Sequence, residues 1–167
     1  MATMAQALAA RIRYQITSGE KLIEAAGERS DAVFGSPQDV LTVRGNVSDV
    51  ALTNHLWLLD AVAAGAVDGA LPAELQRPRP TSVEAAVAFL APRDTDSAEQ
   101  ALSRLRQVNG AIAARVAELS DAQLEKIVDV TFYGKKSLLE LLFIIIEHGA
   151  LHIGQGWGIL KGAGISR

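Results

Sequence analysis

The segment SLLELLFIIIEHGALHIGQGWGILK, residues 137–161, decides the fold expected for this chain. Ser137 and Glu140 match a capping box, in which each of the two side chains bonds the backbone N–H of the other residue at a helix start. Apolar residues then fill nearly every position to Ile146, so the predicted helix is apolar on almost all sides. Such a helix belongs in the middle of a helical bundle or at a subunit interface.

Three stretches upstream carry apolar residues at intervals of three and four, the spacing of an amphipathic helix. The first helix is expected to end near Gly27, the second to be capped by Asn46 or Ser48, and the third to open at a capping box of Asp96 and Glu99. Four long helices, with a long connection between the second and the third, predict an all-α four-helix bundle. A length of 167 residues suits one domain, 1–167.

The connection over residues 67–93 is rich in Gly and Pro, and Thr81 with Glu84 predicts a short capped helix within it. Ser120 with Gln123 predicts a capped turn further along. The stretch VDVTFYG, residues 128–134, alternates in polarity and indicates either one extended arm or half of a small hairpin.

The composition limits the classes of function. A net charge of −3 and a pI near 5.6 argue against nucleic acid as the main partner. The sequence has no cysteine, so a protein thiolate cannot serve as ligand or nucleophile. The most apolar run, Leu138–Ile146, is well short of the roughly 20 residues that span a bilayer. With no secretory signal evident at the N-terminus, we expect a cytoplasmic protein without membrane contact.

The three histidines are the strongest functional signal. His148 and His152 are four residues apart, so both rings lie on one face of the last helix. His55 lies on the second long helix, which can face the last helix in a bundle. Three imidazoles with an open position suit Zn²⁺ or Ni²⁺ best, and Fe²⁺ and Mn²⁺ remain open. The alternative is that the histidines are core polar groups hydrogen-bonded to the backbone.

Three neighbouring residues are candidates for a surrounding pocket. Gln155 follows His152 by one turn and could orient a ligand or substrate, while Asn54 and Trp57 flank His55 and could line the cavity. Core packing explains Asn54 and Trp57 equally well. Glu147 precedes the first histidine of the pair, which is not the order of a metalloprotease motif.

The segments VSDVALTNHLWLLDAV and SLLELLFIIIEHGALHIGQGWGILKGAGI resemble the DinB-like (YfiT-like) metalloenzymes. In that family a histidine on the second helix joins an H-x-x-x-H pair on the last long helix. The resemblance implies that His55, His148 and His152 bind a divalent metal ion, and that the bundle forms a homodimer. Ile153 departs from the basic residue that many relatives carry there, which leaves any anion bound at that position in doubt.

Two functions follow from these observations. The first is a metal-dependent enzyme in which the ion activates a low-molecular-weight thiol, as in S-transferases of the family, or activates water for hydrolysis. The second is a non-catalytic, stress-related dimeric module whose metal site is structural or vestigial. The fourth coordination position separates them, because a catalytic site keeps it open and a structural site closes it with another protein ligand.

Overall fold

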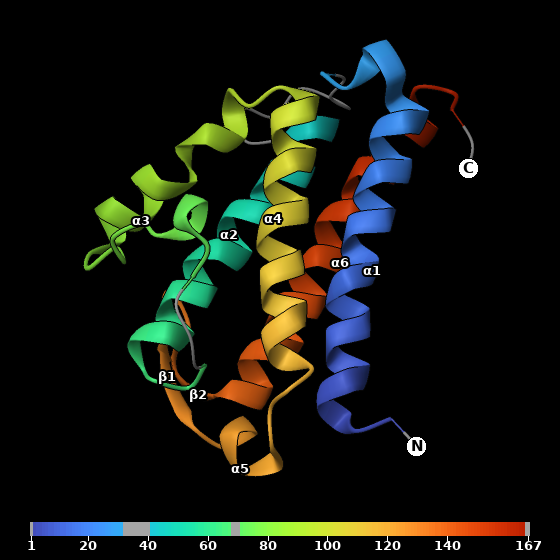
Figure 1. The fold of residues 1–167 in the computed structure, drawn as a ribbon. Helices are drawn as coiled ribbons and strands as arrows, with labels where there is room; N and C mark the ends of the chain where they lie inside the picture. Colours follow the sequence, from blue (N-terminus) through green and yellow to red (C-terminus); the bar gives the residue numbers. More distant parts are fainter. Residues whose placement is uncertain (1, 32–40, 68–70, 166–167) are drawn as a thin grey trace.

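A computed structural model describes residues 2–31, 41–67 and 71–165 of the chain, which is mostly helical (Figure 1). The long helices are α1 (Met4–Ala26), α2 (Val43–Ala63), α4 (Ala98–Val116) and α6 (Leu138–Gly162). The shorter elements are the helices α3 (Val83–Leu90) and α5 (Asp121–Leu124), the 3₁₀ turns η1 (Gly27–Arg29), η2 (Ala73–Leu75) and η3 (Ala91–Asp94), and the strands β1 (Ile127–Val130) and β2 (Gly134–Ser137). The prediction of a helical fold is confirmed, with a small sheet added to it.

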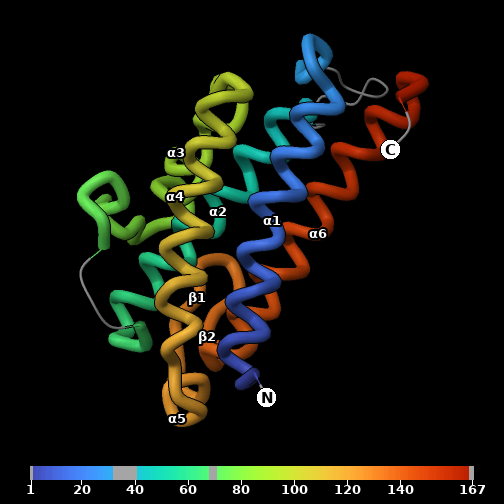
Figure 2. Tube along the Cα trace, turned by 45° about the vertical axis from the view of Figure 1, so that its right-hand side comes forward, coloured from blue at the N-terminus to red at the C-terminus, as the bar shows by residue number. Residues whose placement is uncertain are grey.

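The four long helices pack around a shared core, in which α1 and α2 each contact both α4 and α6. Figures 1 and 2 show α1 and α6 side by side and rising together from the end of the molecule that holds the N-terminus. Gln15 reaches the backbone of Ile145, and Leu22 packs against Gly156, so the two helices run in the same direction. The buried side chains form two apolar clusters that follow one another along the helices.

Helix α2 is the most enclosed element, because nearly every residue from Val43 to Ala61 is buried. Its buried positions include polar side chains as well as apolar ones, among them Asn46, Asp49 and His55. Buried polar groups need partners, so each of these side chains identifies a contact that the fold must supply.

Several predicted helix ends are confirmed. Helix α1 ends at Gly27, whose φ of 51° is the left-handed backbone that glycine adopts without strain. Capping boxes open α6 at Ser137 and α5 at Ser120, as the sequence indicates.

Three predicted helix starts were wrong, by one residue for α3 and α4 and by four or six residues for α2. Helix α2 begins at Val43 with Thr42 as its cap, so Asn46 lies inside the helix and is free for another contact. Helix α3 is capped by Ser82 instead of Thr81, and α4 by Ser97 with Gln100 instead of Asp96 with Glu99. Asp96 does not cap α4 because its carboxylate binds Arg104 and the Ser48 hydroxyl.

The stretch VDVTFYG forms a hairpin, the second of the two predicted alternatives. Strands β1 and β2 pair antiparallel, with Val130 opposite Gly134. The buried Asp60 carboxylate accepts hydrogen bonds from the backbone N–H and the hydroxyl of Thr131, at 2.7 and 3.1 Å, and so fixes the turn to α2. This places the Tyr133 side chain of the turn against Trp57 of α2.

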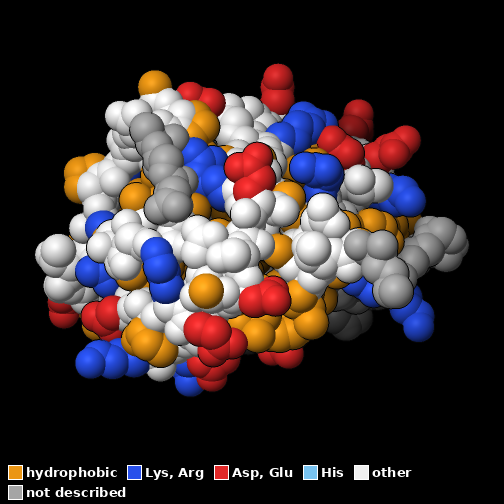
Figure 3. Space-filling view, turned by 60° about the horizontal axis from the view of Figure 1, so that its bottom comes forward, with side chains coloured by type: hydrophobic (Ala, Val, Ile, Leu, Met, Phe, Trp, Pro, Cys, Tyr) orange, Lys and Arg blue, Asp and Glu red, His pale blue; other side chains and the backbone are white. Residues whose placement is uncertain are grey.

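Helix α6 is long and apolar enough to cross a membrane by length and composition alone. The core helix of a soluble protein meets the same criteria, and α6 packs here against α1 and α2. On the face seen in Figure 3, acidic and basic side chains are interspersed with apolar ones. The expectations of no membrane contact and no nucleic-acid partner stay predictions.

Candidate metal centre

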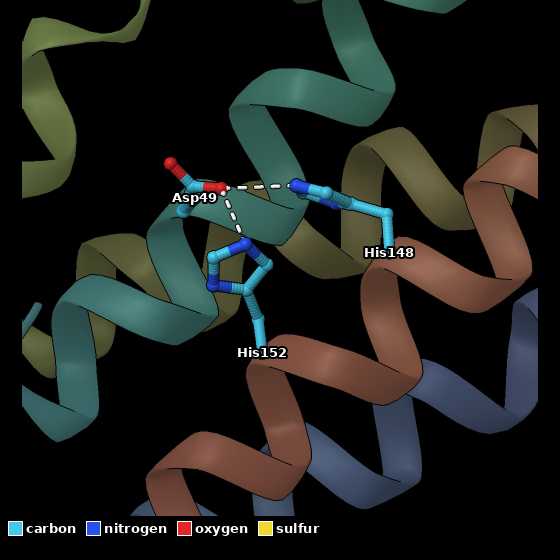
Figure 4. A group of neighbouring side chains, drawn as sticks. All are labelled: Asp49, His148 and His152. Carbon is cyan, nitrogen blue, oxygen red and sulfur yellow. Dashed lines mark ion pairs between the residues drawn. The ribbon is translucent and has the colours of Figure 1, made fainter.

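Two histidines of α6 and one aspartate of α2 meet where these helices pack together (Figure 4). The Oδ2 atom of Asp49 lies 3.2 Å from Nε2 of His148 and 3.3 Å from Nε2 of His152. The spacing of four residues places both rings on one face of α6, as predicted, and their centroids are 4.4 Å apart. Three potential ligand atoms therefore converge on one point between the helices.

The surroundings favour an ionised aspartate. Burial alone would raise the pKa of the Asp49 carboxyl. Hydrogen bonds from His148 and Arg93, together with favourable electrostatic interactions with the two histidines, outweigh burial and lower that pKa to about 2. Asp49 thus carries a negative charge at neutral pH, as a metal ligand must.

His152 is held in the neutral form. Burial is the main reason that its pKa falls to about 4, although the neighbouring Asp49 opposes the shift. Nδ1 of His152 lies 2.9 Å from Oδ1 of Asn46. The Asn46 amide nitrogen in turn donates to the Thr42 carbonyl at 3.0 Å, which identifies Oδ1 as the atom facing the imidazole. Nδ1 therefore carries the proton, and the Nε2 lone pair faces Asp49.

Asp49 is positioned by groups from outside α6. Arg93 of η3 donates to Oδ1 of Asp49 at 2.7 Å, which leaves Oδ2 directed at the two histidines. The segment that carries Arg93 approaches α2 closely at Gly45, where an added Cβ would lie 3.3 Å from the Arg93 carbonyl oxygen. Gly45 thus allows the contact that orients the carboxylate.

Two aromatic side chains, Trp57 and Tyr133, pack on one side of His148. The edge of the Trp57 ring meets His148 at a centroid distance of 5.1 Å, and Tyr133 of the hairpin turn packs edge-on against Trp57 at 5.7 Å. Trp57 Nε1 donates to the Thr131 carbonyl at 3.2 Å, so the indole is fixed to the hairpin. His148 Nδ1 is buried with no hydrogen-bond partner among the described residues. The side chains of His148 and His152 are each 15% exposed.

The three residues fit a divalent first-row ion. Two ligands about 2.1 Å from a tetrahedral ion lie about 3.4 Å apart, close to the observed separations of 3.2 and 3.3 Å. Two imidazole nitrogens and one carboxylate oxygen form a donor set common to Zn²⁺ and to other first-row metals. An imidazole lone pair that faces a carboxylate oxygen is electrostatically unfavourable, and a cation bound between the two atoms would relieve the repulsion.

His55 lies away from this group. Its Nε2 lies 2.9 Å from the Leu75 carbonyl, which can only accept, so this nitrogen carries a proton. The ring is fully buried and packs edge-on against Phe89, and burial lowers its pKa. The ligand role predicted for His55 stays a prediction that this arrangement does not support. The placement matches the alternative for this residue, a core histidine bonded to the backbone.

The other three predicted site residues lie in different surroundings. Trp57 packs against His148, and its role in lining a substrate pocket stays a prediction. Asn54 belongs to a buried amide network, where it donates to Gln15 at 3.2 Å and to Asn109 at 3.0 Å. Gln155 is exposed on α6, and no hydrogen bond joins it to the three donors within the described part of the chain. Roles for Asn54 and Gln155 at the site stay predictions.

Asp49 is the residue that the sequence reasoning missed. It stands in the otherwise apolar run of Val47 to Leu52, apart from Ser48, and so is a charge in a segment that must be buried. A buried carboxylate is paired or binds a metal, so this one charge was the available signal. The sequence-based prediction chose His55, which lies on a different face of α2 from Asp49.

These features define a helical protein with a candidate metal centre between two of its long helices. A family model of the DinB superfamily matches residues 20–155, most of the chain, and the chain belongs to that superfamily. Comparisons with curated proteins and with solved structures found no match. The family expected from the sequence is therefore confirmed.

Proposed function

We propose that the protein is a metal-dependent enzyme of the DinB four-helix-bundle type, with Asp49, His148 and His152 holding one divalent ion. The observation that carries the proposal is the convergence of Asp49 Oδ2 on both Nε2 atoms. A divalent ion bound there supplies Lewis acidity, which lowers the pKa of a bound thiol or water into the neutral range. The favoured substrate pair is a low-molecular-weight thiol and an electrophile, with water as the alternative nucleophile.

The chain's own residues orient and enclose this site. Asn46 holds the tautomer of His152, and Arg93 holds the carboxylate of Asp49 in place. The Trp57 and Tyr133 rings exclude water from one side and offer an apolar surface to a substrate. A thiol nucleophile must come from a substrate, since the chain has no cysteine. Attack then forms a sulfur–carbon bond, and the electrophile's leaving group departs with the electron pair.

An open coordination position favours catalysis over a structural role. Within the described ranges, the group that could hold an ion contains three residues and no fourth His, Asp or Glu. Tetrahedral structural sites are closed by four protein ligands, whereas catalytic sites use three. The partial exposure of both imidazoles gives a substrate a route to the fourth position.

Metal content tests the ligand set. Untagged protein should bind about one Zn²⁺ per chain by elemental mass spectrometry, with Ni²⁺, Fe²⁺ and Mn²⁺ tried in parallel. Asp49→Asn should lose the ion and His55→Gln should keep it. Asp60→Asn is the matched control, because Asp60 is also buried on α2 and paired with an arginine. Loss in His55→Gln with retention in Asp49→Asn would overturn this ligand set.

The nucleophile is tested on protein loaded with Co²⁺, whose visible spectrum reports its ligands. A low-molecular-weight thiol should add a thiolate charge-transfer band, and thiol and electrophile together should be consumed only by the metal-loaded protein. If neither thiols nor small anions changed the spectrum, the coordination sphere of the ion would be closed. The protein would then be the non-catalytic module and not an enzyme. The homodimer and the cytoplasmic location also belong to the proposal.

A further inference from the structure

A groove with a volume of about 860 Å³ runs between α1 and α6. It lies on the other side of α6 from the metal centre, because its lining residues Ala150 and Ile153 are rotated away from His148 and His152. None of the three metal-site donors lines it. Figures 1 and 2 show the two helices that form it lying alongside one another. The groove is therefore separate from the site proposed above.

Small residues create this hollow. Gly149 forms part of the floor, where a Cβ would come within 2.2 Å of the Gln15 side-chain nitrogen. Five residues further along, an added Cβ at Gly154 would meet nothing within 4 Å, so the space above it is open. Ser18 faces them from α1. The helices thus touch along the floor, and short side chains leave the space above it unfilled.

The walls are apolar and the rim is mainly basic. Ile146, Ile153 and the indole of Trp157 line the groove from α6, and the exposed ring of Tyr14 lines it from α1. Arg11 and Lys21 stand on its rim, about 15 Å apart along α1. Neither cation forms an ion pair with a described acidic residue, and Glu24 is the one acid among the lining residues.

We propose that this groove binds an amphipathic anion, an extended apolar chain that carries one carboxylate. Ligand pockets span about 300–1,000 Å³ and combine apolar walls with a few polar groups that fix the ligand's orientation, as this groove does. The stretch from Arg11 to Ala25 covers about 20 Å of α1, enough for a chain of about twelve carbons. The carboxylate pairs with Lys21 or Arg11, and the chain lies over Gly154 and against Trp157.

The test uses dodecanoate, kept below its micelle-forming concentration, in isothermal titration calorimetry. Dodecyltrimethylammonium has the same chain length and the opposite charge, and it serves as the control ligand. We expect saturable binding of about one dodecanoate per chain and at least about tenfold weaker binding of the cation. Equal binding of both ligands, or no saturable binding of dodecanoate, would overturn the proposal.

Paired variants locate the site. Gly154→Leu fills the groove and should weaken dodecanoate binding by about tenfold or more, because it occupies the volume of the chain. Gly158→Leu is its control, since Gly158 is equally open but does not line the groove. At least one of the variants Lys21→Gln and Arg11→Gln should weaken binding by about tenfold, and Arg13→Gln, a cation on α1 outside the groove, should not. If the groove variants and their control variants weakened dodecanoate binding equally, the ligand would not lie in this groove.

Two further readouts separate this proposal from the other claims. Metal content should be unchanged in Gly154→Leu. A failure of dodecanoate binding therefore does not bear on the proposed metal site, and a failure of metal binding does not bear on the proposed groove ligand. Sedimentation of the parent and of Gly154→Leu reports whether a second copy occupies the groove. A dimer in the parent that Gly154→Leu converts to monomer would assign the groove to that copy and exclude the anion.

Discussion

Asn46 Oδ1 lies 2.9 Å from Nδ1 of His152, and this contact decides which imidazole nitrogen is available to a metal. Asn46→Leu removes the acceptor, so the ring loses its fixed tautomer and orientation. We expect metal affinity to fall by about 10- to 100-fold, as found for partners of metal-binding histidines. The measurement is Zn²⁺ competition against a chromophoric chelator.

Asn46→Asp is the control for this variant. It retains the acceptor but loses, like Asn46→Leu, the amide hydrogen bond to the Thr42 carbonyl. Its affinity should stay within a few-fold of the parent. If both variants bound Zn²⁺ equally weakly, the Asn46 side chain would support metal binding by stabilising the start of α2 through Thr42, and not by orienting His152.

His55 should make the stability of the metal-free protein depend on pH. Burial lowers its pKa in the fold below the value of 6.5 expected in the unfolded chain. The unfolded chain therefore takes up the proton first, and the stability present above pH 6.5 is lost as the pH falls. Replacement by Gln keeps an N–H donor for the Leu75 carbonyl but cannot titrate. In urea unfolding with a chelator present, His55→Gln should lose less stability than the parent between pH 7.5 and pH 5.

The limit on this difference is about 1.4 kcal/mol per pH unit, the effect of one proton. His152 and Asp49 also titrate, but they are the same in both proteins, so the difference isolates His55. Parallel curves for the parent and the variant would mean that His55 is as accessible to protons in the fold as in the unfolded chain.

Two glycines of α6 should respond oppositely to alanine. At Gly149 the added methyl would lie 2.2 Å from the Gln15 amide nitrogen, which donates to the Ile145 carbonyl. Gly149→Ala should cost about 1–3 kcal/mol of unfolding free energy through this overpacking. Gly158 faces open space, so Gly158→Ala should add up to about 1 kcal/mol, because alanine favours a helix. Urea denaturation measures both values.

A gain in stability from Gly149→Ala would contradict the close approach of α1 and α6. A loss from Gly158→Ala would show that Gly158 is covered, in the monomer or by another chain.

Local features of the sequence predicted most of the helices and two of the three residues of the candidate site. Capping boxes and the apolar repeat act over three or four residues, so α6 and its histidine pair could be read directly from the chain. The ends of α2 and α4 were misplaced because tertiary contacts overrode local preference. Thr42 starts α2 four residues before Asn46, and Asp96 binds Arg104 instead of capping α4.

The third residue of the candidate site, Asp49, could not be predicted in this way. Asp49 and His55 are six residues apart, which places them about 120° apart around α2 and about 9 Å apart along it. Only the rotation of α2 about its own axis decides which of them meets α6. Since α2 is buried on nearly all sides, its apolar pattern does not specify that rotation. Packing against α4, α6 and η3 sets it instead.

The central claim is that Asp49, His148 and His152 bind one ion, and anomalous diffraction from crystals grown with Zn²⁺ tests it most directly. We predict one anomalous peak per chain, about 2.0–2.2 Å from Oδ2 of Asp49 and from Nε2 of both histidines. A peak coordinated by His55, or no peak between α2 and α6 at saturating Zn²⁺, would contradict the account.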